Sequence, residues 1–351
     1  MGTDTRLTPD QIRDVITENP KTRPRDLADK LGVPEGALVA ATVGHGAVAL
    51  LAAPEKLMPA VCSLGEVMAL TRNDSAVHEK IGAYDNFHAG EHASMVLTKD
   101  IDLRIFGRHW VHAYGVEKEV DGEVRRSLQV FDAAGDAVHK VIMRETSDVA
   151  KWDQMLRDLK GAEQEPVFAD RLPVERPKGD PDKADVLRTE WDKLTDTHQF
   201  LRLISRLKMN RLGAYRIAGA PHAVPLDPSA MNVALQAMSA TGAQIMMFVG
   251  NKGCIQIHSG PIEKLVAMGP WQNVMDPGFN LHLRADHVAE VWLVTKPTKR
   301  GPAVSIEAFD ARGMLILQCF GLRKEGAEDH SATFRALAAD LPKRSVQEEV
   351  A

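Results

Sequence analysis

The chain repeats itself at a distance of about half its length. His78 and Arg104 stand 26 residues apart, and His258 and Arg284 repeat that spacing 180 residues later. A longer match follows at nearly the same offset, between Ser127-Leu-Gln-Val-Phe-Asp-Ala-Ala-Gly and Ser305-Ile-Glu-Ala-Phe-Asp-Ala-Arg-Gly. An offset that holds over this distance indicates an internal duplication. The chain is therefore expected to fold into two similar halves.

Each half is expected to contain a sheet and helices. Short alternating runs such as Ile101-Asp-Leu-Arg-Ile-Phe, separated by turn residues such as Asp121-Gly, are typical of antiparallel strands with one face in the core. A capping box at Thr8 and Gln11 predicts a first helix, and a helix over residues 149–159 closes the first half. We predict an α+β fold with a tandem structural duplication, each half a large antiparallel β-sheet with flanking helices.

A segment rich in proline and charge separates the repeats. Residues 161–185 contain Pro166, Pro173, Pro177 and Pro181 and few large apolar side chains. Such a composition is typical of a linker. We therefore expect an amino-terminal repeat at 1–160, a linker at 161–185 and a carboxy-terminal repeat at 186–345.

Composition excludes several classes of protein. Three cysteines in 351 residues, with no Cys-x-x-Cys pair, argue against a disulfide framework or a zinc site and favour a reducing cytoplasm. The amino terminus lacks the basic-then-apolar order of a secretion signal. The uncharged run from Gly36 to Pro54 is rich in Ala and Gly, so we expect buried elements broken near Gly44-His45-Gly46 and no membrane insertion.

A DNA-binding regulator is a weak alternative. Helix, short glycine turn and helix follow one another from Arg25 to about Ala41, as in a helix-turn-helix. The second helix carries no Arg, Lys, Asn or Gln to read bases or hold phosphates. The net charge is only −5, which neither attracts nor forbids nucleic acid, and we expect no nucleic-acid partner.

The stretch from Thr195 to Gly213 holds the strongest functional candidate. A Thr or Asp among residues 195–197 could cap a helix with His198 in its first turn, and Leu201, Ile204 and Leu207 would form the buried stripe. The remaining surface is basic, which suits an anionic planar ligand. The first repeat has no histidine at the corresponding position, near Thr17, so His198 acts once per chain.

Several long motifs carry a resemblance to a known family. They are Thr195-Asp-Thr-His-Gln-Phe, Asp100-Ile-Asp-Leu-Arg-Ile-Phe, Phe248-Val-Gly-Asn-Lys-Gly-Cys-Ile-Gln-Ile-His-Ser-Gly-Pro, and Phe279-Asn-Leu-His-Leu-Arg-Ala-Asp with Lys296-Pro-Thr. Together they resemble the cytoplasmic haem-utilisation proteins of the HemS, ChuS and HmuS type over nearly the whole chain. The resemblance implies a cytoplasmic protein that binds haem b after import, in a pocket between the two halves.

The resemblance also implies roles for eight residues. His198 resembles the proximal ligand of the haem iron, and Arg104 resembles the arginine on the opposite, distal face, which implies a catalytic role for it. Lys208 falls at a cationic position near the propionates, where lysine keeps the charge without the bidentate geometry of arginine. Pocket-lining positions correspond to Phe248, Lys296, Gln318, Phe320 and Arg323. Phe320 stands where the family has a tyrosine, so one hydroxyl contact is lost.

Strand alternation gives these roles a geometric basis. Arg104 is expected to point away from Leu103 and Ile105, and Gln318 and Phe320 are expected to share one face of their strand. A neutral imidazole is a suitable axial ligand for haem iron. A histidine on one side of the haem and an arginine on the other would suit a carrier as well as an enzyme, so two functions remain open.

The first function is a haem-binding protein that accepts imported haem for trafficking or iron release. The second is a haem-degrading enzyme that opens the ring with a reductant. The partners expected are haem, a haem importer and a haem oxygenase, and the chain is expected to be a monomer or a homodimer.

Overall fold

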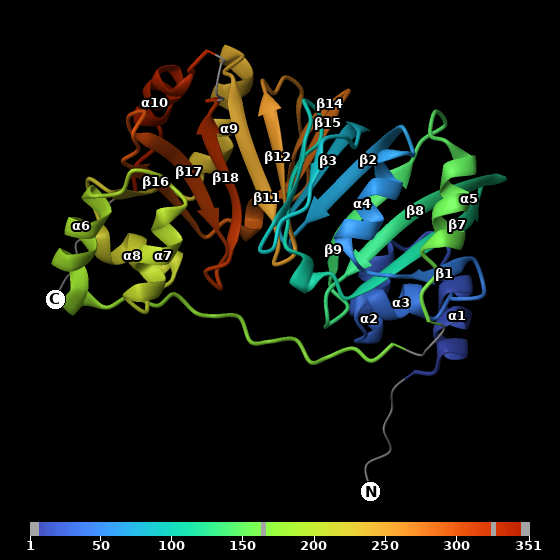
Figure 1. Cartoon of the computed structure of the whole chain (residues 1–351). Coiled ribbons are helices and arrows are strands. Elements are labelled where there is room, and N and C mark those ends of the chain that lie inside the picture. Colours follow the sequence, from blue (N-terminus) through green and yellow to red (C-terminus); the bar gives the residue numbers. More distant parts are fainter. Residues whose placement is uncertain (1–6, 163–165, 324–327, 345–351) are drawn as a thin grey trace, which may run out of the picture. The chain divides into compact units, whose positions relative to one another are not determined.

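The computed structural model describes residues 7–162, 166–323 and 328–344 (Figure 1). The chain divides into two compact units. The first consists of Met1–Arg72, Glu79–Leu172 and Gly250–Gln256, and the second of Asn73–His78, Pro173–Val249 and Ile257–Ala351. Each unit thus includes one short segment from the opposite half of the sequence.

The first unit contains the following elements: α1 (Pro9–Glu18), α2 (Pro24–Leu31), α3 (Glu35–Ala40), β1 (Ala47–Leu50), α4 (Pro54–Cys62), β2 (Glu66–Arg72), most of β3 (Ala76–Ala83), β4 (Phe87–His88), β5 (Ser94–Leu97), β6 (Asp102–Ile105), β7 (His112–Val120), β8 (Glu123–Phe131), β9 (Ala137–Met143) and α5 (Val149–Asp158). A short 3₁₀ turn, η1 (Gly107–His109), follows β6. Its main sheet has the order β1-β7-β8-β9-β2-β3, and β4, β5 and β6 pair in succession beside the Cys254–Gln256 part of β12.

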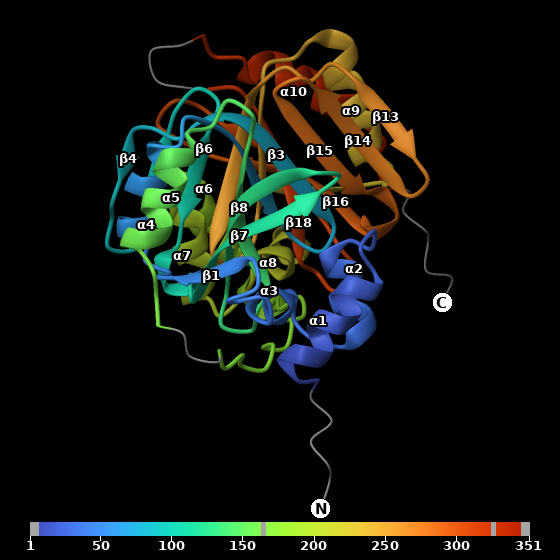
Figure 2. The same ribbon diagram turned by 90° about the vertical axis from the view of Figure 1, so that its right-hand side faces the viewer.

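Helices cover both faces of this sheet. On one face, Leu57, Met58 and Val61 of α4 pack with Trp152 and Met155 of α5 in the largest core of the unit. On the other face, Val39 of α3 packs against Tyr114 and Phe131. The helices α1, α2 and α3 pack on one another through Ile12, Leu27 and Leu38, and Figure 2 shows them as one cluster. The predicted capping box at Thr8 and Gln11 is present.

The second unit contains these elements: η2 (Pro181–Lys183), α6 (Ala184–Asp192), α7 (Gln199–Arg206), α8 (Arg211–Ala218), β10 (Ala223–Leu226), α9 (Ala230–Thr241), β11 (Ile245–Gly250), most of β12 (Cys254–Gly260), β13 (Leu265–Met268), β14 (Trp271–Asp276), β15 (Phe279–Arg284), η3 (Ala285–His287), β16 (Glu290–Lys296), β17 (Ala303–Phe309), β18 (Leu315–Gly321) and α10 (Ser331–Ala339). Its main sheet has the order β10-β16-β17-β18-β11-β12. The strands β13, β14 and β15 pair in succession beside the Ala76–His78 part of β3.

The layers of the second unit repeat those of the first. Met231, Leu235 and Met238 of α9 and Phe334 of α10 pack on one face of the sheet. The cluster of α6, α7 and α8 packs on the other face, where Trp191 and Tyr215 lie in one core with Trp292. The two main sheets have the same strand order, because each strand of the second sheet carries the number of its counterpart in the first plus nine. The predicted α+β duplication is confirmed.

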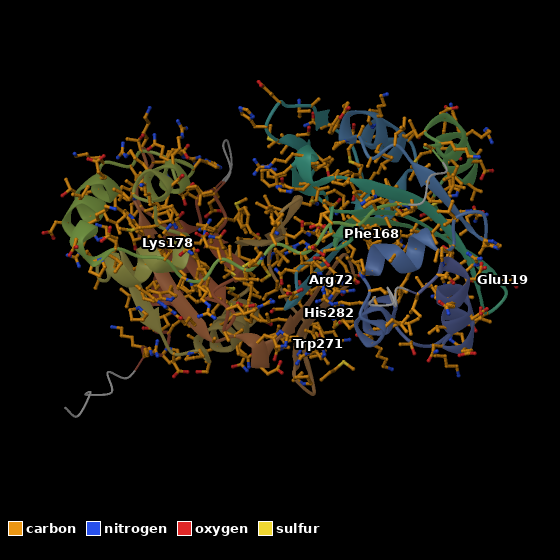
Figure 3. The ribbon with its side chains drawn as sticks, turned by 90° about the horizontal axis from the view of Figure 1, so that it is seen from below. Arg72, Glu119, Phe168, Lys178, Trp271 and His282 are labelled. Atoms are coloured by element: carbon orange, nitrogen blue, oxygen red, sulfur yellow. The ribbon has the colours of Figure 1, made fainter. Side chains whose placement is uncertain are left out.

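The proline-rich segment between the repeats has no helix or strand from 166 to 180. Its two ends are attached to different units. In the first unit, the Phe168 ring lies 4.7 Å from that of His112, and the Ala169 backbone N–H bonds to the Ala133 carbonyl. In the second unit, Lys178 N–H donates to Asn210 Oδ1 at 2.9 Å, and Figure 3 shows Lys178 beside the helical cluster.

Several local predictions can be compared with the structure. Gly44-His45-Gly46 form a turn between α3 and β1, as expected. No described helix is long and apolar enough to span a bilayer. All three cysteines are free thiols.

The predicted buried stripe of α7 is wrong at Leu201, which is 53% exposed. Ile204 and Leu207 are buried as predicted, but Phe200 and Leu203 take the place of Leu201, because the large Phe200 ring packs against Trp191 and Tyr215 and turns Leu201 outward.

Candidate functional site

His198 lies at the N-cap of α7, one residue before the helix begins at Gln199. Its side chain is 92% exposed, and its Nδ1 lies 2.6 Å from Asp196 Oδ1. The same carboxylate oxygen accepts the backbone N–H of His198 at 2.7 Å. The other ring nitrogen, Nε2, has no hydrogen bond to the described residues. An exposed imidazole with one free nitrogen can serve as a metal ligand.

The helix behind His198 rests on a buried charged cluster. Lys296 Nζ lies 4.9 Å from the centre of the Phe200 ring, two residues along from His198. Lys296 Nζ also donates to Glu307 Oε1 and to the Tyr215 hydroxyl, each at 3.1 Å. Arg211 donates to Glu307 Oε2 at 3.1 Å, and the Tyr215 hydroxyl donates to the same oxygen at 2.9 Å. Two cations therefore share one buried carboxylate.

Burial and charge shift the pKa values in this cluster. Burial alone would raise the pKa of Glu307, but the charges of Lys296 and Arg211, with hydrogen bonds from Ser305 and Tyr215, lower it to about 2. Burial lowers the pKa of Lys296 to about 8, although Glu307 opposes this effect. Glu307 is thus fully ionised at neutral pH, and the cluster carries an excess of positive charge.

Strand register places four of the predicted residues on one face of the second sheet. Glu307 pairs with Gln318, and Gln318 pairs in turn with Phe248. Directly paired residues point to the same side, and so do residues two or four apart on one strand. By this rule Phe248, Gln318, Phe320 and Lys296 share the face that carries α6, α7 and α8. The expectation that Gln318 and Phe320 lie on one face is confirmed.

Part of this face is open. Lys296 is only 4% exposed, whereas Phe248, Gln318 and Phe320 are half-buried. The rings of Phe248 and Phe320 lie 5.3 Å apart at 71° in an edge-to-face arrangement. Two aromatic rings and an amide, beside a buried cation, offer a surface on which a flat ligand with acidic substituents can lie.

A shallow hollow lies at the α7–α8 turn. It measures about 450 Å³ and is lined by Leu201, Ser205 and Lys208, with Lys178 of the linker and Arg211 of α8 among its other walls. Residues three and four apart on a helix are neighbours, so Leu201 and Ser205 continue the stripe on which His198 lies. Lys208 has a positive φ of 61°, which ends α7 and turns the chain toward α8.

Arg323 follows β18 and is held in place by nearby groups. Its guanidinium forms an ion pair with Asp329 at 3.3 Å and donates to the Gly301 carbonyl at 3.4 Å. Its side chain is 13% exposed. Arg323 therefore presents little of its guanidinium to the surface in this conformation.

Arg104 belongs to the first unit. It lies on β6 and forms an ion pair with Asp102, and its Nη1 also donates to the Leu103 carbonyl at 3.1 Å. Leu103 and Ile105 on either side are buried and Arg104 is 32% exposed, as alternation predicts. Its counterpart in the repeat, Arg284, pairs with Asp286, so both copies hold this arginine through a nearby carboxylate.

Sequence reasoning missed three members of the site. The sequence predicts only a helix cap among residues 195–197, which include Asp196, and it indicates no role for Tyr215 or Glu307. Glu307 carried a usable signal, since a carboxylate at the centre of an otherwise uncharged strand needs a buried cation. Nothing in the sequence shows that its partners come from α8 and β16.

Comparison with known proteins gives consistent results. The family model of the haemin-degrading HemS.ChuX domain matches residues 32–159 and 208–341, once in each half. His198 lies between the two matched ranges. The haemin transport protein HmuS of Yersinia pestis is 37% identical over 317 residues, covering 90% of this chain and 91% of that protein. HemS of Yersinia enterocolitica, also described as a haemin transport protein, is 37% identical over 328 residues, covering 92% and 94%.

Solved structures agree in fold. Holo-PhuS of Pseudomonas aeruginosa, described as a haem-binding protein, superposes with a TM-score of 0.91 at 40% identity, covering 96% of this chain and all of that one. ChuS of Escherichia coli O157:H7, described as a haem-degrading enzyme, gives a TM-score of 0.85 at 33% identity, covering 94% and 97%.

Proposed function

Because this chain belongs to the family of haemin-degrading HemS.ChuX proteins, we propose that it binds haem b as a cytoplasmic protein of haem-iron utilisation. It accepts imported haem and holds it for trafficking or for release of the iron. The observation that carries this proposal is His198, whose Nε2 bonds to none of the residues that the structure describes and whose side chain is 92% exposed. The chemistry of this donor fits haem, because a neutral imidazole is a common axial ligand of its iron.

The other residues of the proposed site divide by chemistry. Phe248 and Phe320 offer rings against which the macrocycle packs, and Gln318 offers an amide on the same face of the sheet. Lys208 supplies positive charge for the propionates, and Arg323 lines the pocket while bonded to Asp329 and the Gly301 carbonyl. Lys296 is bonded to Glu307 and Tyr215, so its charge acts from beneath the surface unless the cluster opens. Arg104 acts on the distal side, where its guanidinium can donate a hydrogen bond.

Titration with hemin tests the proposal. The wild-type chain should give a sharp Soret band with a saturable stoichiometry, and His198→Ala should bind more weakly and with a changed spectrum. His222→Ala is a matched control, because His222 is buried and bonded to Asp192 at 2.8 Å. A His198→Ala spectrum and affinity equal to those of the wild type would rule out His198 as the ligand. Only the broad absorption of free hemin with the wild-type chain would refute haem binding.

A second candidate function is haem degradation by the chain itself. ChuS of Escherichia coli, 32% identical in one solved structure, is described as a haem oxygenase, which favours this candidate. Bound haem supplies redox chemistry, and the chain would hold the ring and exclude water. Ascorbate added to the holoprotein in the presence of catalase distinguishes the two functions. Loss of the Soret band indicates degradation, and an unchanged spectrum with transfer to a separate haem oxygenase indicates carriage.

Partners and location are part of the same proposal. We expect a haem importer to deliver the ligand, a haem oxygenase to receive it if the chain is a carrier, and a monomer or homodimer in the cytoplasm. Pull-down from cytosolic and membrane fractions with haem-loaded and haem-free chain tests the first two expectations. Sedimentation of both forms tests the third.

A further inference from the structure

Asp196 is turned back onto His198. One carboxylate oxygen, Oδ1, lies 2.7 Å from the backbone nitrogen of His198 and 2.6 Å from Nδ1 of its ring. An ionised carboxylate can only accept hydrogen bonds. The short contact therefore requires a proton on Nδ1, which leaves the lone pair of a neutral ring on Nε2.

The turn that carries Asp196 is itself closed by hydrogen bonds. Gln199 Oε1 accepts the Thr195 N–H at 2.9 Å, and Gln199 Nε2 donates to Thr195 Oγ1 at 3.1 Å. These bonds fix residues 195–199 at the start of α7 without involving the imidazole. The Asp196 side chain is 56% exposed and that of His198 is 92% exposed, so packing does little to hold either.

We propose that Asp196 is a positioning residue for His198, an inference that rests on the proposed haem-binding function. It selects the tautomer with Nε2 free, limits the rotation of an otherwise exposed ring and increases the electron donation of that ring to iron. Histidines that bind metals commonly donate their second N–H to a carboxylate, and loss of such a partner typically lowers metal affinity by about 10- to 100-fold. Without Asp196, the ring is free to adopt both tautomers and several rotamers.

The first test uses the haem-free chain. In protein with ¹⁵N-labelled histidine, long-range ¹H–¹⁵N spectra report which ring nitrogen carries the proton, and the His198 signal is assigned from its loss in His198→Ala. The wild type should show the Nδ1–H form. Asp196→Ala should shift His198 toward the Nε2–H form, and Asp196→Asn, which keeps the shape and loses the charge, should lie between them.

The second test uses the haem-bound chain. The iron–histidine stretching frequency of the ferrous form, measured by resonance Raman spectroscopy, should fall in Asp196→Ala. Hemin affinity should fall about 10- to 100-fold. Asp196→Glu should recover part of both. Asp192→Asn is a matched control, since Asp192 also bonds to a histidine, His222, but does not contact His198.

The outcomes separate this inference from the proposed function. Haem binding through His198, with an unchanged tautomer and unchanged stretching frequency in Asp196→Ala, would overturn the role of Asp196 alone. A wild-type chain that binds no haem, or binds it equally well without His198, would overturn both. A shift in tautomer and frequency in Asp196→Ala, absent in Asp192→Asn, supports the inference.

Discussion

Replacing Glu307 with Gln tests whether the folded chain depends on this carboxylate to balance the charges of Lys296 and Arg211 beneath α7. Glu307 has no exposed surface, and its side chain bonds to Lys296, Arg211, Tyr215 and Ser305. The variant leaves the buried Lys296 and the half-buried Arg211 without their anion. Removing one partner of a buried ion pair typically costs about 3–5 kcal/mol, and we expect a loss of that size.

Lys296 should behave differently although it belongs to the same cluster. Burial lowers its pKa from 10.5 to about 8. At 1.36 kcal/mol per pKa unit, keeping Lys296 charged in the folded chain at neutral pH costs about 3 kcal/mol of stability. In Lys296→Met, Glu307 keeps Arg211 as a partner, so we expect little destabilisation. The double variant should be less destabilised than the sum of the single variants, with a coupling of about 1–3 kcal/mol.

Urea unfolding at pH 7 measures these effects. Trp191 is a suitable reporter, because its ring lies 4.5 Å from that of Phe200 and 5.9 Å from that of Tyr215. Glu190→Gln is the control, since this carboxylate pairs with Lys193 and Arg206 at the surface and its loss should barely move the midpoint. A loss below about 1 kcal/mol for Glu307→Gln, or a costlier Lys296→Met, would refute the reasoning, because buried unpaired charge must destabilise.

Three further predictions concern other parts of the molecule. Arg104→Ala should still bind hemin, but the absorption bands of the bound hemin that depend on the sixth ligand of the iron should change. A spectrum identical to that of the wild type at every pH would show that Arg104 has only a structural role. Asn210→Ala should cost about 1–2 kcal/mol, because Asn210 caps α8 at Gly213 and donates to the Arg176 carbonyl at 2.7 Å, and limited proteolysis should cut residues 166–180 faster. Burial lowers the pKa of His139 to about 3, so between pH 6.5 and 3 the unfolded chain binds a proton at this residue and the folded chain does not. The free energy of unfolding therefore falls as the pH drops from 6.5 toward 3, at up to roughly 1.4 kcal/mol per pH unit. Urea midpoints at pH 7 and 5 should show this dependence in the wild type and a smaller one in His139→Leu.

The sequence by itself determined the duplication, the fold class and the residue types of the site. These features follow from the order of residues along the chain: an offset near 180 residues, the period of two in strands, and helix caps such as Thr8. The repeat is visible by comparing the two halves of the sequence, and the strand period and the caps involve near neighbours, so none of them requires knowledge of the fold. The family resemblance rested on the same kind of evidence, since its motifs are contiguous.

Only the tertiary structure decided which stripe of α7 is buried, where Lys296 points and what holds His198. Leu201 and Phe200 are adjacent and both apolar, and the contact of Phe200 with Trp191 and Tyr215 selects which one is buried. Lys296 and Glu307 meet because β16 and β17 pair, and Arg211, 96 residues before Glu307, joins them from α8. Contacts between distant parts of the chain depend on strand register and helix packing, which composition and periodicity do not encode.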